Sequence, residues 1–235
     1  MQYVERAVIL AAGKGERLEP LTKETPKPLL EVNGKRMIET IIKALRDNGI
    51  DEIYVVVGYL KEQFSYLIDE GIILIENPFY MTCNNISSLY VAREHLENSI
   101  ILDGDQVIYN SKILHKEFER SGYNAIYTNE YTHEWVMEVE DGIVKNCTVS
   151  GEKGWQLFSI SRWNKEDALK LKKYLEVEFE EKENHSIYWD DIPMFIYKDK
   201  FELGITKMKE SDVIEIDSCD ELVRIDHSYI DRIKK

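Results

Sequence analysis

The chain has 235 residues, a formal net charge of −14 and 43% hydrophobic residues, a composition typical of a globular protein. The acidic balance argues against a general nucleic-acid binder, because phosphate contacts need a basic face. No apolar run reaches the roughly 20 residues that cross a bilayer, and the N-terminus lacks a signal-peptide pattern. The three cysteines are well separated and suggest neither disulfides nor a zinc site. We therefore expect a cytoplasmic protein with neither nucleic acid nor membrane as a partner.

The N-terminal half alternates strand and helix patterns. Short apolar runs predict four strands, at 7–10, 53–57, 72–75 and 99–102. Helical spacing of apolar side chains predicts three helices, at 37–46, 60–69 and 86–96. This alternation predicts a parallel sheet covered by helices, with ligands at the carboxyl ends of the strands. The polar loops 11–17 and 103–105 both follow strands, so we expect them to meet at that edge.

From about residue 123 the pattern changes to short alternating strands. They are predicted at 125–127, 136–139, 143–149 and 157–160. Asp141-Gly142 is a hairpin signal between two of them. Helical spacing returns at 165–179, and a strand at 213–216 precedes a final helix from about 218. Because no linker-like stretch divides the chain, we expect one domain over 1–235, in which residues 123–200 form a β-rich lid subdomain over the carboxyl edge of the sheet.

The most informative motif is LAAGKGERLEP at 10–20, followed by PKP at 26–28. It is not a Rossmann fingerprint, because Leu18 occupies the third glycine position, and it is not a P-loop, because neither Ser nor Thr follows the lysine. The backbone N–H groups of a glycine loop can approach an anion closely. Arg17 and Lys27 can add a planar fork and a point charge for phosphate oxygens. The pattern therefore predicts a phosphate site.

Two carboxylates, Asp103 and Asp105, follow the strand at 99–102. Such a pair suits Mg²⁺, which takes one or two carboxylates together with phosphate oxygens. An Asp-Gly-Asp run beside a strand is about as often simple turn chemistry. Side chains two residues apart in extended backbone share a face, so Asp103 can support the site from behind Asp105.

All four tryptophans fall within residues 135–189, where carboxylates are interleaved with aromatic side chains. Aromatic faces with carboxylates nearby hold ammonium cations, and an aromatic cage suits a quaternary one in particular. The alternative is that these residues form the aromatic core of a small subdomain, which is the more common case for any single residue.

The N-terminal motif closely resembles the signature of the nucleotidyltransferases that make NDP-sugars and CDP-alcohols. Within that family the chain resembles the bacterial choline-phosphate cytidylyltransferases of the Lic pathway. The resemblance rests on the pair Glu134-Trp135, the run 188–190 and the segments 57–64, 84–90 and 215–218, so it covers nearly the whole chain. The chain departs from the family at 103–106, where DGDQ stands in place of DADN, and at 150–156. These departures concern the acceptor and leave the nucleotide chemistry unaffected.

The resemblance implies a Rossmann-like, GT-A-like α/β fold with a mixed, mainly parallel sheet flanked by helices. It implies transfer of CMP from CTP to phosphocholine with Mg²⁺ as cofactor, catalytic roles for Lys27, Arg17 and Asp105, and metal binding by Asp105 and Asp217. Nucleotide binding is implied for Leu10, Ala11, Ala12, Gly13, Lys14, Gly15, Arg17, Gly58, Tyr59, Asn85, Ser87 and Ser88. Acceptor binding is implied for Glu134, Trp135, Tyr188, Trp189 and Asp190.

Several alternatives stay open at this point. The same family includes cytidylyltransferases for 2-aminoethylphosphonate, some of them fused to a transaminase. A sugar-1-phosphate nucleotidyltransferase shares the N-terminal signature, but it would need polar sugar contacts where this chain has aromatic residues. A non-catalytic nucleotide-sensing module should have lost at least one of Arg17, Lys27, Asp105 and Asp217, and all four are present. We expect a monomer or a homodimer.

Overall fold

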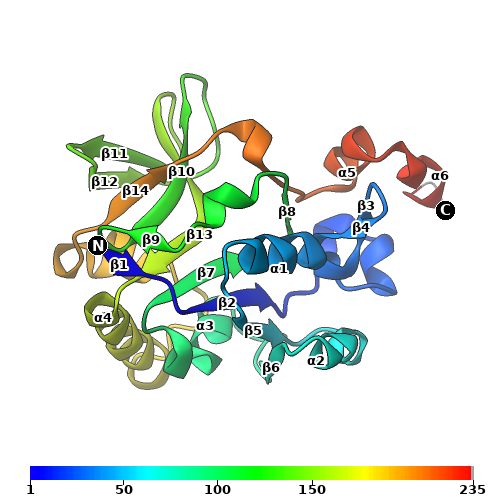
Figure 1. Cartoon of the computed structure of the whole chain (residues 1–235), viewed down its shortest axis with the longest axis horizontal. Helices are drawn as coiled ribbons and strands as arrows, with labels where there is room; N and C mark the ends of the chain where they lie inside the picture. The colour runs from blue at the N-terminus through cyan, green and yellow to red at the C-terminus, as the bar shows by residue number, and fades with distance from the viewer. Residues whose placement is uncertain (234–235) are drawn as a thin grey trace.

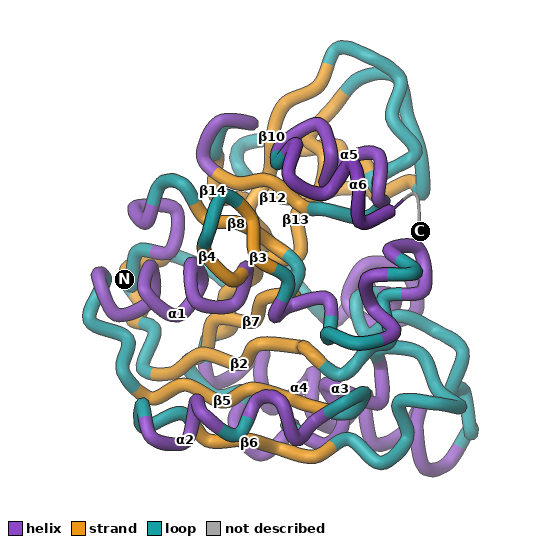
Figure 2. Tube along the Cα trace, turned by 90° about the vertical axis from the view of Figure 1, so that its right-hand side faces the viewer, coloured by secondary structure: helices purple, strands orange, loops and turns teal. Residues whose placement is uncertain are grey.

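A nine-stranded mixed sheet forms the centre of the computed structural model, which describes residues 1–233. Its parallel part consists of β7 (Ser99–Asp103), β2 (Arg6–Ala11), β5 (Glu52–Val57) and β6 (Ile73–Glu76), in this order. Figure 2 shows these four strands one below the other. They match the four strands predicted for the N-terminal half, and as buried parallel strands they are almost continuously apolar.

Helices cover both faces of the parallel strands. On one face, α1 (Met37–Asp47) and α2 (Tyr66–Asp69) bury apolar side chains against Ile9 and Val55. On the other face, α3 (Ile86–Val91) and α4 (Lys165–Glu176) pack on the alternate strand residues Val8 and Val56. In Figure 1, α3 and α4 lie together below the sheet. Each strand therefore contributes to two cores, as the period of two along a strand requires.

The strands of the second half continue this sheet. They are β10 (Gly122–Thr128), β11 (Val136–Glu140), β12 (Ile143–Thr148), β13 (Gly154–Trp163) and β14 (Gly204–Lys207). β13 pairs antiparallel with β7, and β10 pairs with both β13 and β14. Since β14 pairs with β12, β12 with β11 and β11 with β13, the five strands close into a ring. The sheet is therefore mixed, as expected, but it is not mainly parallel, since five of its nine strand pairings among the described residues are antiparallel. The β-rich segment extends this sheet, and the lid role of residues 123–200 stays a prediction.

The hairpin signal explains why antiparallel pairs dominate this region. Asp141 and Gly142 have positive φ angles of 51° and 77°, as a two-residue hairpin turn of the primed type needs, and they join the antiparallel neighbours β11 and β12. β14 was not predicted. β14 pairs in parallel with β10, a strand that ends more than seventy residues before β14 begins. No local sequence pattern indicates a pairing over such a distance.

Short elements complete the fold. Two-residue strands pair as β1 (Gln2–Tyr3) with β9 (Glu117–Phe118), and as β3 (Glu31–Val32) with β4 (Lys35–Arg36). Three expected helices are shorter than predicted: α2 follows a 3₁₀ turn at 61–64, α3 ends at Val91 before a turn at 93–95, and α4 passes into a π-type turn at 177–181. Over residues 1–233, no helix combines the length and the apolar character needed to cross a membrane.

The C-terminal segment packs on the N-terminal loop region. β15 (Val213–Glu215) pairs antiparallel with β8 (Gln106–Ile108), and α5 (Cys219–Ile225) and α6 (Ile230–Ile233) follow. Leu222 and Tyr229 share a core cluster with Leu18 and Leu30, and the Tyr229 hydroxyl donates to the Glu31 carbonyl at 2.7 Å. Figure 1 shows α5 and α6, in red, beside the blue β3 and β4. This packing brings the end of β15 next to the end of β7.

Candidate active site

The glycine loop is folded back on the Pro-Lys-Pro segment. Gly15 has a φ of 64°, and a Cβ built on it would lie 2.9 Å from the Cβ of Lys27, so both the backbone conformation and the space require glycine there. The Thr22 hydroxyl donates to the Gly15 carbonyl at 3.0 Å and holds the turn in place. Leu18, which rules out a Rossmann fingerprint, is fully buried beneath this turn. The loop and Lys27 therefore form one packed unit.

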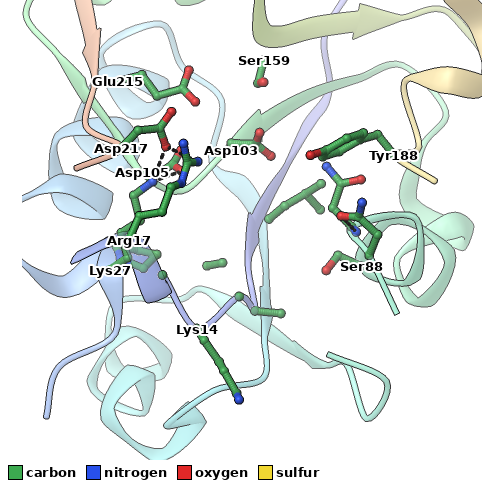
Figure 3. Close-up of a pocket in the computed structure, with 18 of the residues that line it drawn as sticks. Lys14, Arg17, Lys27, Ser88, Asp103, Asp105, Ser159, Tyr188, Glu215 and Asp217 are labelled. Carbon is green, nitrogen blue, oxygen red and sulfur yellow. Dashed lines mark hydrogen bonds and ion pairs between the residues drawn. The ribbon is translucent and has the colours of Figure 1, made fainter. Parts of the chain in front are cut away.

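Two cations converge on two carboxylates at the end of β7 and β15. The Lys27 ammonium lies 2.6 Å from Asp105 Oδ2 and 2.9 Å from Asp217 Oδ1. Arg17 donates to the same Asp217 oxygen at 2.8 Å (Figure 3). Burial by itself lowers the pKa of Lys27, but the carboxylates of Asp105 and Asp217 outweigh it and the pKa is raised. Lys27 is therefore a fixed positive charge, and Arg17, Lys27, Asp105 and Asp217 lie in one cluster.

A third carboxylate, Glu215, completes an acidic cluster that we did not predict. One oxygen each of Asp105, Glu215 and Asp217 can lie within 4.8 Å of one another, close enough to share a metal ion. Burial, followed by the charges of Asp105 and Asp103, raises the pKa of Glu215 well above its usual value. Asp105 Oδ1 is buried and has no hydrogen-bond partner among the described residues. An orphaned carboxylate oxygen in an oxygen-only cluster fits a hard cation.

Asp103 lies beside this cluster on the cavity side. Burial, and then the neighbouring Asp105 carboxylate, raise the pKa of Asp103 to about 7. Asp103 is therefore only partly ionised near neutral pH, and its side chain lies on the cavity side beside Asp105, as its position two residues before Asp105 predicts. Burial also raises the pKa of Glu134, which lines the cavity next to Trp135.

These groups line one cavity of about 770 Å³ at the carboxyl edge of the parallel strands. Most of the predicted site residues border it: Leu10, Ala11, Ala12, Gly13, Lys14, Gly15, Arg17, Lys27, Asn85, Ser88, Asp105, Glu134, Trp135, Tyr188, Asp190 and Asp217. Figure 3 shows Ser88 and Tyr188 across the cavity from Lys27 and the acidic cluster. The cavity thus joins an end with paired charges to an end where neutral polar and aromatic side chains predominate.

Four predicted residues do not line the cavity. The Trp189 side chain is only 2% exposed and stacks on Tyr123 within the core, at a centroid distance of 6.1 Å, so its assignment to acceptor binding is corrected. Ser87 is buried beneath the cavity wall. Gly58 acts through packing, because a Cβ there would lie 2.8 Å from the Tyr80 ring, and Tyr59 donates its backbone N–H to the Ala12 carbonyl. Their assignment to direct nucleotide contact is corrected.

The neutral end contains an aromatic corner. The rings of Trp135 and Tyr188 stand at 89° to each other with centroids 6.2 Å apart, and Phe195 packs edge-on against Trp135 at 4.9 Å. Asp190 also borders the cavity, and its Oδ1 accepts a hydrogen bond from the Tyr123 hydroxyl at 2.8 Å. Burial, followed by the charge of Asp103, raises the pKa of Asp190 well above its usual value. A buried carboxylate of this kind is stabilised by a cation in the cavity.

Several lining residues were missed by the sequence reasoning: Tyr80, Met81, His133, Leu157, Ser159 and Glu215. Glu215 could have been found, because it stands two residues before Asp217 and extended residues two apart share a face. Ser159 and Leu157 lie on β13, which reaches the cavity only because it pairs with β7. No signal in the sequence indicates that pairing.

One edge of the sheet carries a glycine loop, two cations and several carboxylates. This is the set of groups expected at the active site of a nucleotidyltransferase. The chain belongs to the family of MobA-like NTP transferase domains, which residues 7–149 match. Over 229 residues it is 37% identical to a 2-aminoethylphosphonate cytidylyltransferase of Lancefieldella rimae, with 95% of this chain and 93% of the relative covered. It is 34% identical over 223 residues to a choline-phosphate cytidylyltransferase of Streptococcus pneumoniae, with 94% and 96% covered.

The fold is shared with solved structures over its whole length. The CTP:phosphocholine cytidylyltransferase of Streptococcus pneumoniae superposes with a TM-score of 0.88 at 34% identity, covering 99% of this chain and all of the other. An inositol-1-phosphate CTP transferase of T. maritima superposes with a TM-score of 0.76 at 17% identity, which shows the fold alone. The predicted nucleotidyltransferase fold and the predicted kinship with the choline-phosphate cytidylyltransferases are therefore confirmed.

Proposed function

We propose that this protein is a cytidylyltransferase that transfers CMP from CTP to phosphocholine and releases pyrophosphate. The observation that carries the proposal is the convergence of Arg17, Lys27, Asp105 and Asp217 at one end of a cavity whose other end holds the Trp135–Tyr188 corner. The charged end suits a triphosphate and the aromatic end suits a quaternary ammonium. The relatives that cover nearly the whole chain are cytidylyltransferases.

The chemistry needs no protein nucleophile and no general base. An oxygen of the acceptor phosphate is already anionic, so it can attack the α-phosphorus of CTP directly while pyrophosphate leaves on the opposite side. The backbone N–H groups of Ala12 to Gly15 and the Arg17 guanidinium bind the triphosphate. Lys27 stabilises the charge that develops at the reacting phosphorus, because packing against the glycine loop fixes its position.

Asp105 and Asp217, with Glu215 beside them, would hold Mg²⁺. The orphaned Asp105 Oδ1 and the all-oxygen donor set fit this ion, which keeps several waters and prefers carboxylate and phosphate oxygens. Bound Mg²⁺ would neutralise phosphate charge. Glu221 orients Asp217, since its carboxylate accepts the backbone N–H groups of Asp217 and Ser218 at 2.7 and 2.9 Å.

The acceptor end favours a cation with no N–H donors. A trimethylammonium group loses little on leaving water, and aromatic faces such as those of Trp135 and Tyr188 serve it well. Asp190 and Glu134 border the same cavity, and a cation bound there would favour their ionised forms, which burial disfavours. A sugar acceptor would instead need hydrogen-bonding groups where these rings stand. The protein is not a decayed sensing module in this proposal, because all four charged residues remain and converge.

2-Aminoethylphosphonate is the second candidate acceptor. It is favoured by the identity of 37% to the cytidylyltransferase named for it and by the carboxylates at the aromatic end. A primary ammonium keeps three donors, all of which need acceptors once they are buried. Asp190 can accept fewer hydrogen bonds from such an ammonium group, because its Oδ1 already accepts one from the Tyr123 hydroxyl.

We expect phosphocholine to win a direct competition between the two acceptors at equal concentration with CTP and Mg²⁺. Trp135→Ala should raise the KM for phosphocholine at least tenfold, since each aromatic face contributes roughly 0.5–2 kcal/mol to binding a cation. Product ratios are measured by ³¹P NMR. The matched control is Trp155→Ala, which removes a tryptophan of β13 that packs on Tyr127 and does not line the cavity.

The opposite outcome identifies the second acceptor. A tenfold or larger preference for 2-aminoethylphosphonate, about 1.4 kcal/mol of discrimination in the transition state, would overturn the choice of phosphocholine and leave cytidylyl transfer standing.

A further inference from the structure

Asn77 directs two serines from beneath the cavity wall. It follows β6 directly, is 1% exposed and does not line the cavity. Its Oδ1 accepts the backbone N–H of Phe79 at 2.9 Å, and its Nδ2 donates to the hydroxyl oxygens of Ser87 and Ser88 at 3.0 and 3.1 Å. A backbone N–H can only donate, so the orientation of this amide is fixed by chemistry. Both serine oxygens are therefore acceptors toward Asn77.

The two hydroxyl hydrogens have different fates. Ser87 donates its hydrogen to the Asn84 carbonyl at 2.8 Å. Within residues 1–233, no protein group accepts the hydrogen of Ser88, and Ser88 lines the cavity, on the side opposite Lys27 and the acidic cluster (Figure 3). A hydroxyl whose oxygen already accepts one bond satisfies itself best by donating its hydrogen to a ligand. Ser88 thus presents a donor to the cavity.

Asn85 presents a second donor beside it. Its Oδ1 accepts the backbone N–H of Trp189 at 3.0 Å, which again fixes the amide and leaves the NH₂ group for the cavity that Asn85 lines. Asn85 and Ser88 are three residues apart at the start of α3, so their side chains lie on the same side of the helix. The neutral wall therefore offers two neighbouring donors.

Cytosine is the pyrimidine that matches two neighbouring donors, because its O2 and N3 are adjacent acceptors. Uracil and thymine carry a hydrogen on N3, and adenine places a donor or a carbon beside each ring acceptor. Guanine also has adjacent acceptors, O6 and N7, but on the edge of a larger purine, so two neighbouring donors discriminate cytosine from the other pyrimidines. We propose that Asn77, which does not line the cavity, selects cytosine over uracil by holding the Ser88 hydroxyl as a donor. This inference rests on the proposed function and names the residue that sets its base specificity.

The test reverses the polarity of one buried group. Asn77→Asp is nearly isosteric and keeps an oxygen for the Phe79 N–H, but it replaces the NH₂ donor with a second acceptor. The Ser88 hydrogen then turns to the new carboxylate, and the serine offers only lone pairs to the base. We expect the ratio of kcat/KM for CTP to that for UTP to fall at least tenfold, and the ratio of CMP to UMP affinities in calorimetry to fall with it.

Three further variants separate this effect from damage to the fold. Asn124→Asp places a carboxylate at another buried asparagine, where the Arg162 guanidinium donates at 2.7 Å, and should leave both ratios unchanged. Ser88→Ala should lower both ratios at least tenfold by itself, and it tests the proposal even where Asn77→Asp fails to fold. In the double variant Asn77→Asp/Ser88→Ala, the effect of the first substitution should disappear.

The outcomes are distinguishable from those that test the proposed function. The role of Asn77 is overturned if Ser88→Ala leaves the CTP/UTP and CMP/UMP ratios unchanged. It is also overturned if Asn77→Asp still changes these ratios in a chain that lacks the Ser88 hydroxyl. Neither result affects the proposal of cytidylyl transfer. The protein could also prefer CMP in the way that depends on Asn77 and yet release no pyrophosphate from any nucleotide. That result would support the inference about Asn77 and overturn the proposed transferase activity.

Discussion

We expect Asp105→Ala and Asp217→Ala each to lower kcat by about a thousandfold or more without unfolding the protein. Each substitution removes a carboxylate that would hold Mg²⁺, and the orphaned Asp105 Oδ1 has no other role among the described residues. It also removes one of the two partners of the Lys27 ammonium, so the cation loses its fixed position. Steady-state pyrophosphate release gives kcat, and electron paramagnetic resonance with Mn²⁺ as the probe gives metal affinity.

The matched control is Asp220→Ala, which removes an exposed carboxylate three residues after Asp217, at the start of α5. It should leave kcat and Mn²⁺ binding unchanged. An excess of chelator should abolish turnover of the wild-type enzyme, and added Mg²⁺ should restore it. Full turnover in either site variant, or in chelator, contradicts the metal assignment, and circular dichroism distinguishes a chemical defect from an unfolded chain.

The parts of the site that could be predicted are those that one local pattern specifies completely. The glycine loop follows a buried strand directly, and Asp105 follows another, so the parallel order of β2 and β7 is sufficient to bring them together. Lys27 could be placed because Gly15 and the Pro-Lys-Pro segment belong to one short folded unit. Gly15 and Lys27 are close in the sequence, and the adjacent parallel strands β2 and β7 follow a strand order that is standard for α/β folds.

The run at 188–190 shows where this reasoning stops. Tyr188 is 51% exposed at the cavity, Trp189 is buried between Tyr123 and Trp163, and Asp190 is buried on the Tyr123 hydroxyl. The residues lie in a turn, where neither a period of 2 nor one of 3.6 tells which side chain faces the ligand. The partners that decide it come from β10 and β13. A family resemblance that covers the whole run also does not tell which of the three side chains faces the cavity.

The ring of strands from β10 to β14 was missed for a related reason. Its closing pairs join residues far apart in the chain, and the pairing of β12 with β14 involves Ile143 and Gly204 alone. Gly122 and Gly204 make the close approach possible, since a Cβ on Gly122 would lie 2.0 Å from the Gly204 carbonyl oxygen. Each glycine on its own looks like an ordinary turn residue, and only the pair carries the information.

Lys27→Ala should lower kcat at least a hundredfold with little change in the KM for CTP. The ammonium is fixed between Asp105 and Asp217 at the charged end of the cavity, and the two carboxylates keep the amine protonated by raising its pKa against the effect of burial. A charge aimed at the reacting phosphorus stabilises the transition state more than the bound substrate, so its loss appears in kcat. Rapid-quench single turnovers measure the chemical step separately from product release.

Lys23→Ala is the matched control, because Lys23 is an exposed lysine of the same segment whose partner is Glu19, and it should change neither constant. Lys27→Arg keeps the charge, but the larger planar group does not fit the buried site, so we expect it to recover only part of the lost rate. A loss confined to the KM for CTP would make Lys27 a binding group. The rate acceleration would then have to come from Arg17 and the backbone N–H groups of the glycine loop, which we propose bind the triphosphate. Unlike Lys27, these groups are not fixed between two carboxylates.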